Sequence, residues 1–168
     1  MADCATKSYF AYGSNLWLDQ MSRRCPSSVF TSVARLPNYR WIISERGYAN
    51  IVRSPGDEVW GMLYDLPPAD EASLDRYEGV PVAYVKEMMT VELVDGGSAE
   101  VLVYIDYNHV LDGVVLEEYV GRMSSGIKDA IRKGVPVGYI RKYFLGPLGL
   151  GEEVLRPGSS GGERRLGN

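Results

Sequence analysis

Short runs of apolar and aromatic residues, separated by turn residues, fill the first two thirds of the chain and predict β-strands. The first run, Lys7–Tyr12, is rich in aromatic residues and ends at Gly13-Ser14-Asn15, which is typical of a tight turn. Further strands are predicted at Ser28–Arg35, Tyr39–Ser44, Ala49–Arg53, Glu58–Tyr64, Tyr84–Leu93 and Ala99–Ile105. Turns are expected between them at Pro37-Asn38, at Ser54-Pro55-Gly56-Asp57, which has the chemistry of a hairpin loop, and at Asp95-Gly96-Gly97.

Helical periodicity is clearest over Leu116–Lys133, where apolar residues recur every three or four positions. Gly134 then ends the pattern. A short helix is predicted over Asp19–Arg24, and another over Pro67–Gly79, where proline suits the first turn and glycine suits the C-cap.

About five to seven strands with few helices indicate an α+β fold, in which a small and strongly bent antiparallel sheet or barrel carries flanking helices. We expect one domain over residues 7–150. Residues 151–168 are polar and rich in glycine, and they are expected to form a flexible tail.

Net charge and the length of the apolar runs argue against two classes of function, nucleic-acid binding and membrane insertion. The 168 residues carry a formal net charge of −4 and a pI of about 5.1, so no basic field favours nucleic-acid binding. No apolar run approaches the roughly 20 residues of a membrane span, and the first residues lack the apolar core of a signal peptide. We therefore expect a cytoplasmic protein that binds neither nucleic acid nor membrane, with Cys4 and Cys25 as free thiols whose role stays open.

The turn Tyr12-Gly13-Ser14-Asn15-Leu16 is the first candidate for chemistry. Small residues directly after a strand let successive backbone N–H groups point into one concavity, which can hold a carboxylate or a developing oxyanion. An ordinary turn at the end of a strand is the alternative interpretation, because Gly-Ser-Asn is common turn material.

Glu78 is the second candidate. It lies at the predicted carboxyl end of a helix, where the helix dipole disfavours a negative charge and raises the pKa of the carboxyl toward neutrality. Acid–base catalysis needs such a pKa, although a solvated surface glutamate is the alternative. Asp70, Glu71 and Asp75 in the same helix are expected to be solvated.

Tyrosine usage is the third signal, since the chain has 12 Tyr and only 3 Phe. A buried tyrosine needs a partner for its hydroxyl, so the surplus suggests a polar cavity with aromatic walls, although each tyrosine alone is compatible with the core or its rim. The single His109 and two distant cysteines lack the spacing of a metal site. Ser14 and Cys25 have no evident base partner, so acid–base chemistry without metal or cofactor remains.

Taken together, these blocks resemble the γ-glutamylcyclotransferase superfamily, also called AIG2-like. The similar segments follow one another in a consistent order: Tyr9–Leu16, Val33–Leu36, Ser54–Gly61 and Leu74–Val80. Tyr84, Tyr104 and Tyr119 fall where that family has tyrosines around its pocket.

The resemblance implies a small barrel whose first turn faces a catalytic glutamate, here Glu78. It implies a small-molecule substrate with a γ-glutamyl or related carbonyl group, whose own α-amino group attacks the γ-carbonyl to give 5-oxoproline and a free amine or amino acid. Substrate-binding residues carried over in this way are Tyr12, Gly13, Ser14, Asn15, Leu16, Tyr84, Tyr104 and Tyr119.

One segment departs from the family pattern. Between Trp41 and Ala49 the chain is shorter than in the vertebrate-type enzymes, and one glycine stands where a pair is expected, which leaves the leaving group and the pathway open. Two alternatives therefore remain: a relative recruited to another carbonyl cyclisation, isomerisation or lyase step on a specialised metabolite, and a non-catalytic ligand-binding module. The sequence does not distinguish a monomer from a homodimer.

Overall fold

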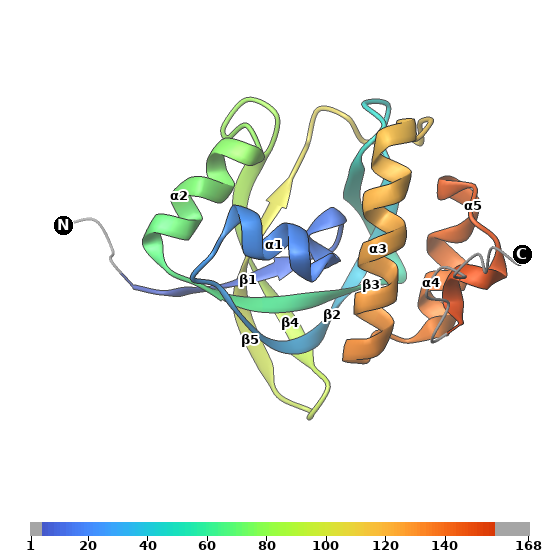
Figure 1. Ribbon diagram of the computed structural model, residues 1–168. Coiled ribbons are helices and arrows are strands. Elements are labelled where there is room, and N and C mark those ends of the chain that lie inside the picture. The colour runs from blue at the N-terminus through green and yellow to red at the C-terminus, as the bar shows by residue number, and fades with distance from the viewer. Residues whose placement is uncertain (1–4, 157–168) are drawn as a thin grey trace, which may run out of the picture.

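The computed structural model describes residues 5–156, in which five strands close into a barrel with helices around it (Figure 1). The strands follow the order β1-β3-β2-β4-β5 around the barrel. Their bounds are Lys7–Ala11 for β1, Val29–Ile43 for β2, Ala49–Leu66 for β3, Val85–Leu93 for β4 and Ser98–Ile105 for β5. The prediction of an α+β fold built on a small barrel-like sheet is confirmed.

Neighbouring strands are antiparallel except at the closure of the barrel, where β1 pairs with β5 in parallel through Tyr9 and Leu102. β1 therefore lies between β3 and β5. Because the turn Tyr12–Leu16 follows β1 directly, this position between two strands fixes where the turn begins.

Four strands were predicted between Ser28 and Tyr64, but the structure has two long strands there, β2 and β3. The predicted hairpin at Ser54-Pro55-Gly56-Asp57 is therefore wrong, because this segment lies within β3. Both turn-like segments lie opposite each other inside the β2–β3 pair, where the register shifts between Pro37 and Tyr39. Asn38 and Gly56 have φ angles of 65° and 89°, and the Gly56 N–H donates to Asn38 Oδ1 over 3.2 Å. The turn residues thus bend a paired ribbon, which continues on both sides of the bend.

Helices cover the barrel on the side of the β1 turn and beyond the end of β2 (Figure 1). The predicted helices correspond to α1 (Leu18–Arg24), α2 (Pro68–Tyr77) and α3 (Glu117–Lys133), which Gly134 ends with a φ of 114°. A short 3₁₀ helix, η1 (Ser14–Leu16), links β1 to α1.

Three short helices were missed by the sequence analysis: α4 (Val137–Tyr143), α5 (Leu145–Leu148) and the 3₁₀ helix η2 (Glu152–Leu155). Glycine or proline interrupts the sequences of α4 and α5, and η2 has only four residues, so none of them shows a helical period. Packing holds this region instead, since Phe144 between α4 and α5 stacks on Trp41 with 4.1 Å between ring centroids. The predicted flexible tail is wrong for η2, whose Val154 and Leu155 are buried. The rest of that tail, residues 157–168, lies outside the described residues.

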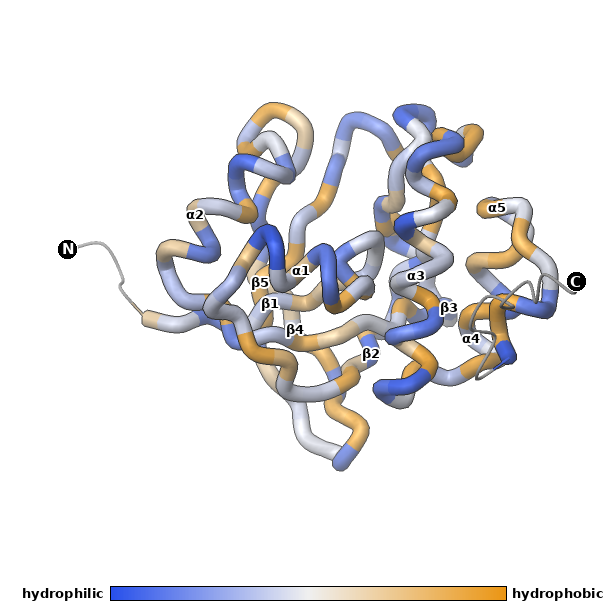
Figure 2. Tube along the Cα trace, viewed as in Figure 1, coloured by the Kyte–Doolittle hydropathy of each residue, from blue (hydrophilic) through white to orange (hydrophobic). Residues whose placement is uncertain are grey.

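Apolar side chains fill the barrel and the space beneath the helices. Figure 2 shows hydrophobic and hydrophilic positions alternating along α3, and its buried residues include Met123, Ile127 and Ala130. Among residues 5–156 no helix is both long enough and apolar enough to cross a lipid bilayer.

Candidate active site

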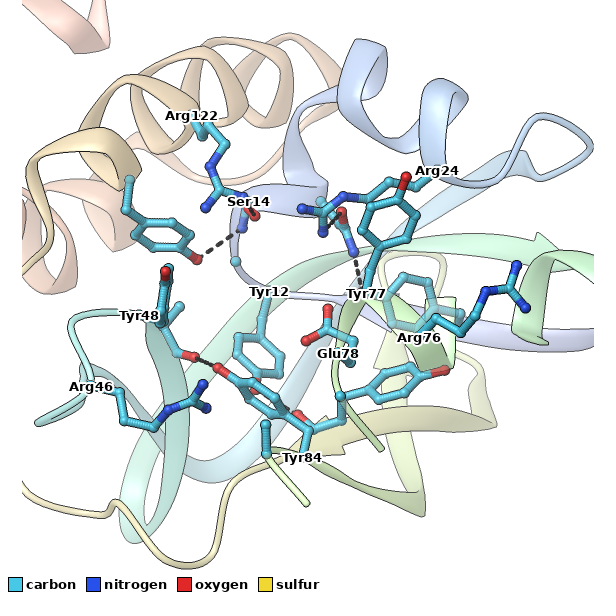
Figure 3. Close-up of a pocket in the computed structure, with 18 residues that line it drawn as sticks. Tyr12, Ser14, Arg24, Arg46, Tyr48, Arg76, Tyr77, Glu78, Tyr84 and Arg122 are labelled. Carbon is cyan, nitrogen blue, oxygen red and sulfur yellow. Dashed lines mark hydrogen bonds between the residues drawn. The ribbon is translucent and has the colours of Figure 1, made fainter. Parts of the chain in front are cut away.

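Glu78 lies at the carboxyl end of α2, where the sequence predicted it. It is the C-cap residue, and its N–H donates to the Leu74 carbonyl over 2.9 Å. Gly79 follows with a φ of 64°, the left-handed conformation that favours glycine, and turns the chain away from the helix. Figure 3 shows the Glu78 carboxylate directed into the middle of a pocket.

The turn after β1 forms a second wall of this pocket, and it is built around a close approach. A Cβ at Gly13 would lie 2.9 Å from the Tyr119 hydroxyl and 3.1 Å from the Ala49 Cβ, so glycine is needed there. The next amide, of Ser14, donates to the same Tyr119 hydroxyl over 3.2 Å. The turn is thus joined to α3 through a residue far along the chain.

Polar contacts hold the side chains of the turn in place. Gln20 Nε2 donates to Ser14 Oγ over 2.8 Å and to Asn15 Oδ1 over 3.0 Å. Asn15 in turn donates from Nδ2 to the Tyr9 hydroxyl over 3.0 Å, and its carbonyl accepts from the Tyr64 hydroxyl over 3.1 Å. Ser14 and Asn15 are both buried, so this part of the site is rigid.

The cavity between these walls has a volume of about 310 Å³ and gathers most of the predicted site. Eight of the nine predicted residues line it: Tyr12, Gly13, Ser14, Asn15, Glu78, Tyr84, Tyr104 and Tyr119. Leu16 does not line it, because its side chain is buried behind the turn against α3, where a Cβ at Gly126 would come within 3.1 Å of the Leu16 Cβ.

The hydroxyl groups of the pocket tyrosines have different partners. Tyr12 donates to the Tyr104 carbonyl over 2.5 Å, Tyr104 to Asp75 Oδ1 over 2.7 Å, and Tyr84 to the Ala49 carbonyl over 2.9 Å. These three tyrosines therefore line the cavity with their rings, while their hydroxyl protons are used in hydrogen bonds within the protein. The Tyr119 hydroxyl instead accepts from Ser14, which leaves its own proton to be donated elsewhere.

Burial raises the pKa of the Glu78 carboxyl to about 7, while the charges of Arg24, Arg122 and Arg46 act in the opposite direction. The direction agrees with the sequence analysis, although the main cause is removal from water rather than the helix dipole. Near neutral pH the group can therefore both accept and release a proton.

Comparison with known proteins agrees with this arrangement. Residues 9–119 match the family described as gamma-glutamyl cyclotransferase, AIG2-like. The chain belongs to that family. The gamma-glutamylcyclotransferases of Bos taurus and Homo sapiens are 32% and 30% identical to it, over 75% of this chain and 88% of each relative. A solved structure described as "Gamma-glutamyl cyclotransferase" matches with a TM-score of 0.74 at 28% identity, over 94% of this chain and 92% of that chain.

This cyclotransferase-family chain also places arginines around the cavity, which the sequence analysis missed. Arg24, Arg46, Arg76 and Arg122 line it, and Glu78 is the sole acidic residue among the described lining residues. They come from α1, the β2–β3 turn, α2 and α3, so no local motif unites them. Only Arg122 could have been placed at the cavity from the sequence, because it lies three residues after Tyr119 on the same face of the predicted helix.

The other acidic residues of α2 differ from the expectation of solvated side chains. Asp70 is buried and accepts from the Ser27 amide over 2.9 Å, while Glu71 is buried between Lys7 and Lys86. These contacts tie α2 to the barrel, which fixes the helix end that carries Glu78.

Cys25 has no chemical partner in the cavity. It is buried, its thiol donates to the Asp70 carbonyl over 3.5 Å, and burial raises the pKa of the thiol to about 12. Such a thiol is a poor nucleophile near neutral pH. Cys4 lies outside the described residues.

Proposed function

We propose that this protein is a γ-glutamylcyclotransferase that converts a γ-glutamyl amide into 5-oxoproline and a free amine or amino acid. The observation that carries the proposal is the shared cavity of Glu78, with its carboxyl pKa raised to about 7, and the rigid turn after β1. The family match and the names of the vertebrate relatives support the same reaction.

The substrate's own α-nitrogen is the nucleophile, so the protein has to fold the substrate and move protons. Glu78 takes a proton from the α-ammonium, the nitrogen attacks the γ-carbonyl carbon, and a ring C–N bond forms. The bond to the leaving nitrogen then breaks as that nitrogen receives the proton from Glu78. Overall, two protons pass from the α-nitrogen to the leaving nitrogen, which departs as an ammonium, and no water is consumed.

The turn and Tyr119 stabilise the negative charge that develops on the γ-carbonyl oxygen. The Leu16 amide closes η1 on the Gly13 carbonyl, and the Ser14 amide bonds to Tyr119. We assign the amides of Gly13 and Asn15, on the cavity side of the turn, as the donors to this oxygen. Together with the proton of the Tyr119 hydroxyl they supply fixed dipoles that need little reorganisation during the reaction.

Two arginines beside the turn suit the α-carboxylate of the glutamyl group. Arg24 Nη1 lies 3.4 Å from Asn15 Oδ1, and Arg122 Nη1 lies 3.5 Å from Ser14 Oγ. Their guanidinium groups are therefore held at the turn, where a planar donor pair can bind a carboxylate. Binding there would place the α-nitrogen next to Glu78.

The direct test is release of 5-oxoproline, measured by mass spectrometry, from γ-glutamyl amino acids, γ-glutamyl amines and glutathione. We expect release from at least one of these classes, also in the presence of EDTA. In Glu78→Gln we expect kcat/KM to fall by about 10²–10⁴-fold, because an amide neither accepts nor releases a proton near neutral pH.

Glu100→Gln is the matched control, since Glu100 is an exposed residue of β5 outside the cavity. It should retain wild-type activity. Full activity of Glu78→Gln, or no 5-oxoproline from any class of substrate with folded wild-type protein, would contradict the proposal.

A further inference from the structure

Arg46 lies on the β2–β3 turn, in the segment where the sequence departs from the family pattern. Its guanidinium carbon is 5.7 Å from the ring centroids of both Tyr48 and Tyr84, so aromatic rings flank it. Figure 3 shows Arg46 pointing into the pocket beside Tyr84, while Arg24 and Arg122 enter on the side of Ser14. The cavity therefore has positive charge at two separate places.

The Nη1 atom of Arg46 is a buried donor without a hydrogen bond in the described part of the chain. It lies 3.5 Å from Asp106 Oδ2, which attracts its charge but does not accept its proton in a hydrogen-bond geometry. Asp106 Oδ2 is itself only 2.8 Å from His109 Nδ1. Nη1 itself is closed off from solvent beside Asp106, but the Arg46 side chain as a whole is 32% exposed and lines the cavity, so the other N–H groups of its guanidinium are the donors open to a ligand oxygen.

The arginines at these two places differ in whether they contact the turn after β1. Arg24 and Arg122 contact side chains of the turn, next to the amides that would hold the glutamyl half of the substrate. Arg46 has no such contact with the turn, and it reaches the cavity from the β2–β3 side. A substrate whose glutamyl half occupies the turn therefore directs its leaving group toward Arg46.

We infer that Arg46 binds a carboxylate on the leaving group and so selects γ-glutamyl amino acids or peptides over uncharged γ-glutamyl amides. The inference rests on the proposed function. A dianionic substrate also matches the charge of the cavity, since Arg24, Arg46 and Arg122 point toward it and Glu78 is the single acidic residue among the described lining residues. A charge-assisted hydrogen bond from a planar guanidinium is the interaction that would discriminate.

The test compares γ-glutamyl-alanine with γ-glutamyl-alaninamide, two substrates of nearly equal shape that differ in the charge of the leaving group. We expect wild-type kcat/KM to favour γ-glutamyl-alanine by about 100-fold, the size expected of one hydrogen bond to a charged group. In Arg46→Gln the preference should fall to about threefold or less, because kcat/KM falls for γ-glutamyl-alanine and stays unchanged for γ-glutamyl-alaninamide. Arg46→Lys keeps the charge without the planar guanidinium, so it should show an intermediate preference.

Arg40→Gln is the matched control. Arg40, on β2, is half-exposed like Arg46 and also pairs with an aspartate, at 3.3 Å from Asp112, but it does not line the cavity. It should keep the wild-type preference. Because the two substrates share one γ-glutamyl group and one catalytic carboxyl, their ratio is insensitive to any change in the pKa of Glu78.

Three outcomes separate the claims. A wild-type ratio near one, or an unchanged ratio in Arg46→Gln, overturns the role of Arg46 while release of 5-oxoproline leaves the proposed function standing. An equal loss on both substrates in Arg46→Gln also overturns it, since that would indicate a general structural role. No 5-oxoproline from these two substrates, nor from the γ-glutamyl amines and glutathione of the first test, contradicts the proposed function itself.

Discussion

At the scale of single residues, the site is organised by opposing effects on Glu78. Burial favours the neutral carboxyl, while Arg24, Arg122 and Arg46 favour the carboxylate. With the carboxyl pKa at about 7, the carboxylate is present above neutral pH and is lost as the pH falls below it.

The pH dependence of kcat/KM follows from this balance. We expect the wild-type value to decline as the pH falls through about 7, because protonated Glu78 cannot accept the ammonium proton. Arg24→Gln removes a charge that lowers this pKa, so the decline should move to higher pH. The measurement is the pH profile of 5-oxoproline release, with the position of the acid limb as the readout.

Arg132→Gln serves as its control, because Arg132 is exposed at the end of α3 and pairs with Asp129. Its profile should coincide with that of the wild type. An acid limb of Arg24→Gln that stays in place or moves to lower pH would contradict the electrostatic argument.

At the scale of elements, α3 positions the turn as much as β1 does. Tyr119 accepts from the Ser14 amide, Asp129 accepts from the Leu18 amide over 2.9 Å, and Gly126 lets the helix approach η1 closely. A Cβ at Gly126 would lie 3.1 Å from both the Leu16 Cβ and the Trp17 nitrogen. Leu16 and Trp17 lie between β1 and α1 in a turn held by these contacts, so they cannot move away from an added methyl group without displacing the turn.

Two glycines of α3 therefore provide a matched pair of substitutions. Gly126→Ala should lower the free energy of unfolding by about 1–2 kcal/mol and reduce kcat/KM, because the methyl group displaces the turn. Gly121→Ala meets nothing within 4 Å and should raise the free energy of unfolding by about 0.5–1 kcal/mol without loss of activity. Urea denaturation and 5-oxoproline release check both; shifts of stability in the same direction would contradict the packing argument.

At the scale of the whole molecule, the buried Glu78 carboxyl lowers the stability of the fold at neutral and alkaline pH. Its pKa is higher in the folded state, about 7 against 4.5 for the free group, so the folded protein loses stability relative to the unfolded chain as the pH rises through this interval. Acid pH, below about 4.5, removes the effect, because the carboxyl is then protonated in both states.

Glu78→Gln should consequently be more stable than the wild type at pH 8, by about 2 kcal/mol, after allowance for the partial exposure of the side chain. The difference should disappear near pH 4. The measurement is urea denaturation of both proteins at the two pH values. The contributions of the other titrating groups to the free energy of unfolding are the same in both proteins and cancel in the difference. A difference that is the same at both pH values would show that the charge of Glu78 is not its cause.

The sequence predicted those parts of the molecule that depend on neighbouring residues. Gly79 as a helix C-cap, Glu78 just before it and the glycine-containing turn after β1 are local features, and all lie where they were predicted. The β2–β3 ribbon was divided wrongly because its bend uses turn residues on both strands at once. The arginine lining could not be predicted, since closure of the barrel brings it together from four distant elements.

The parallel closure of the barrel also affects how the protein is made. β1 leaves the ribosome first, yet its partner strands β3 and β5 come much later, and the Ser14 amide bonds to a residue 105 positions downstream. After β3 has emerged, β1 can pair on one side only, so until β5 follows the nascent chain carries an open sheet edge, a state that promotes aggregation and invites chaperones. The turn after β1 gains its contact with the Tyr119 hydroxyl only when α3 has emerged, so the site is completed after all five strands have left the ribosome.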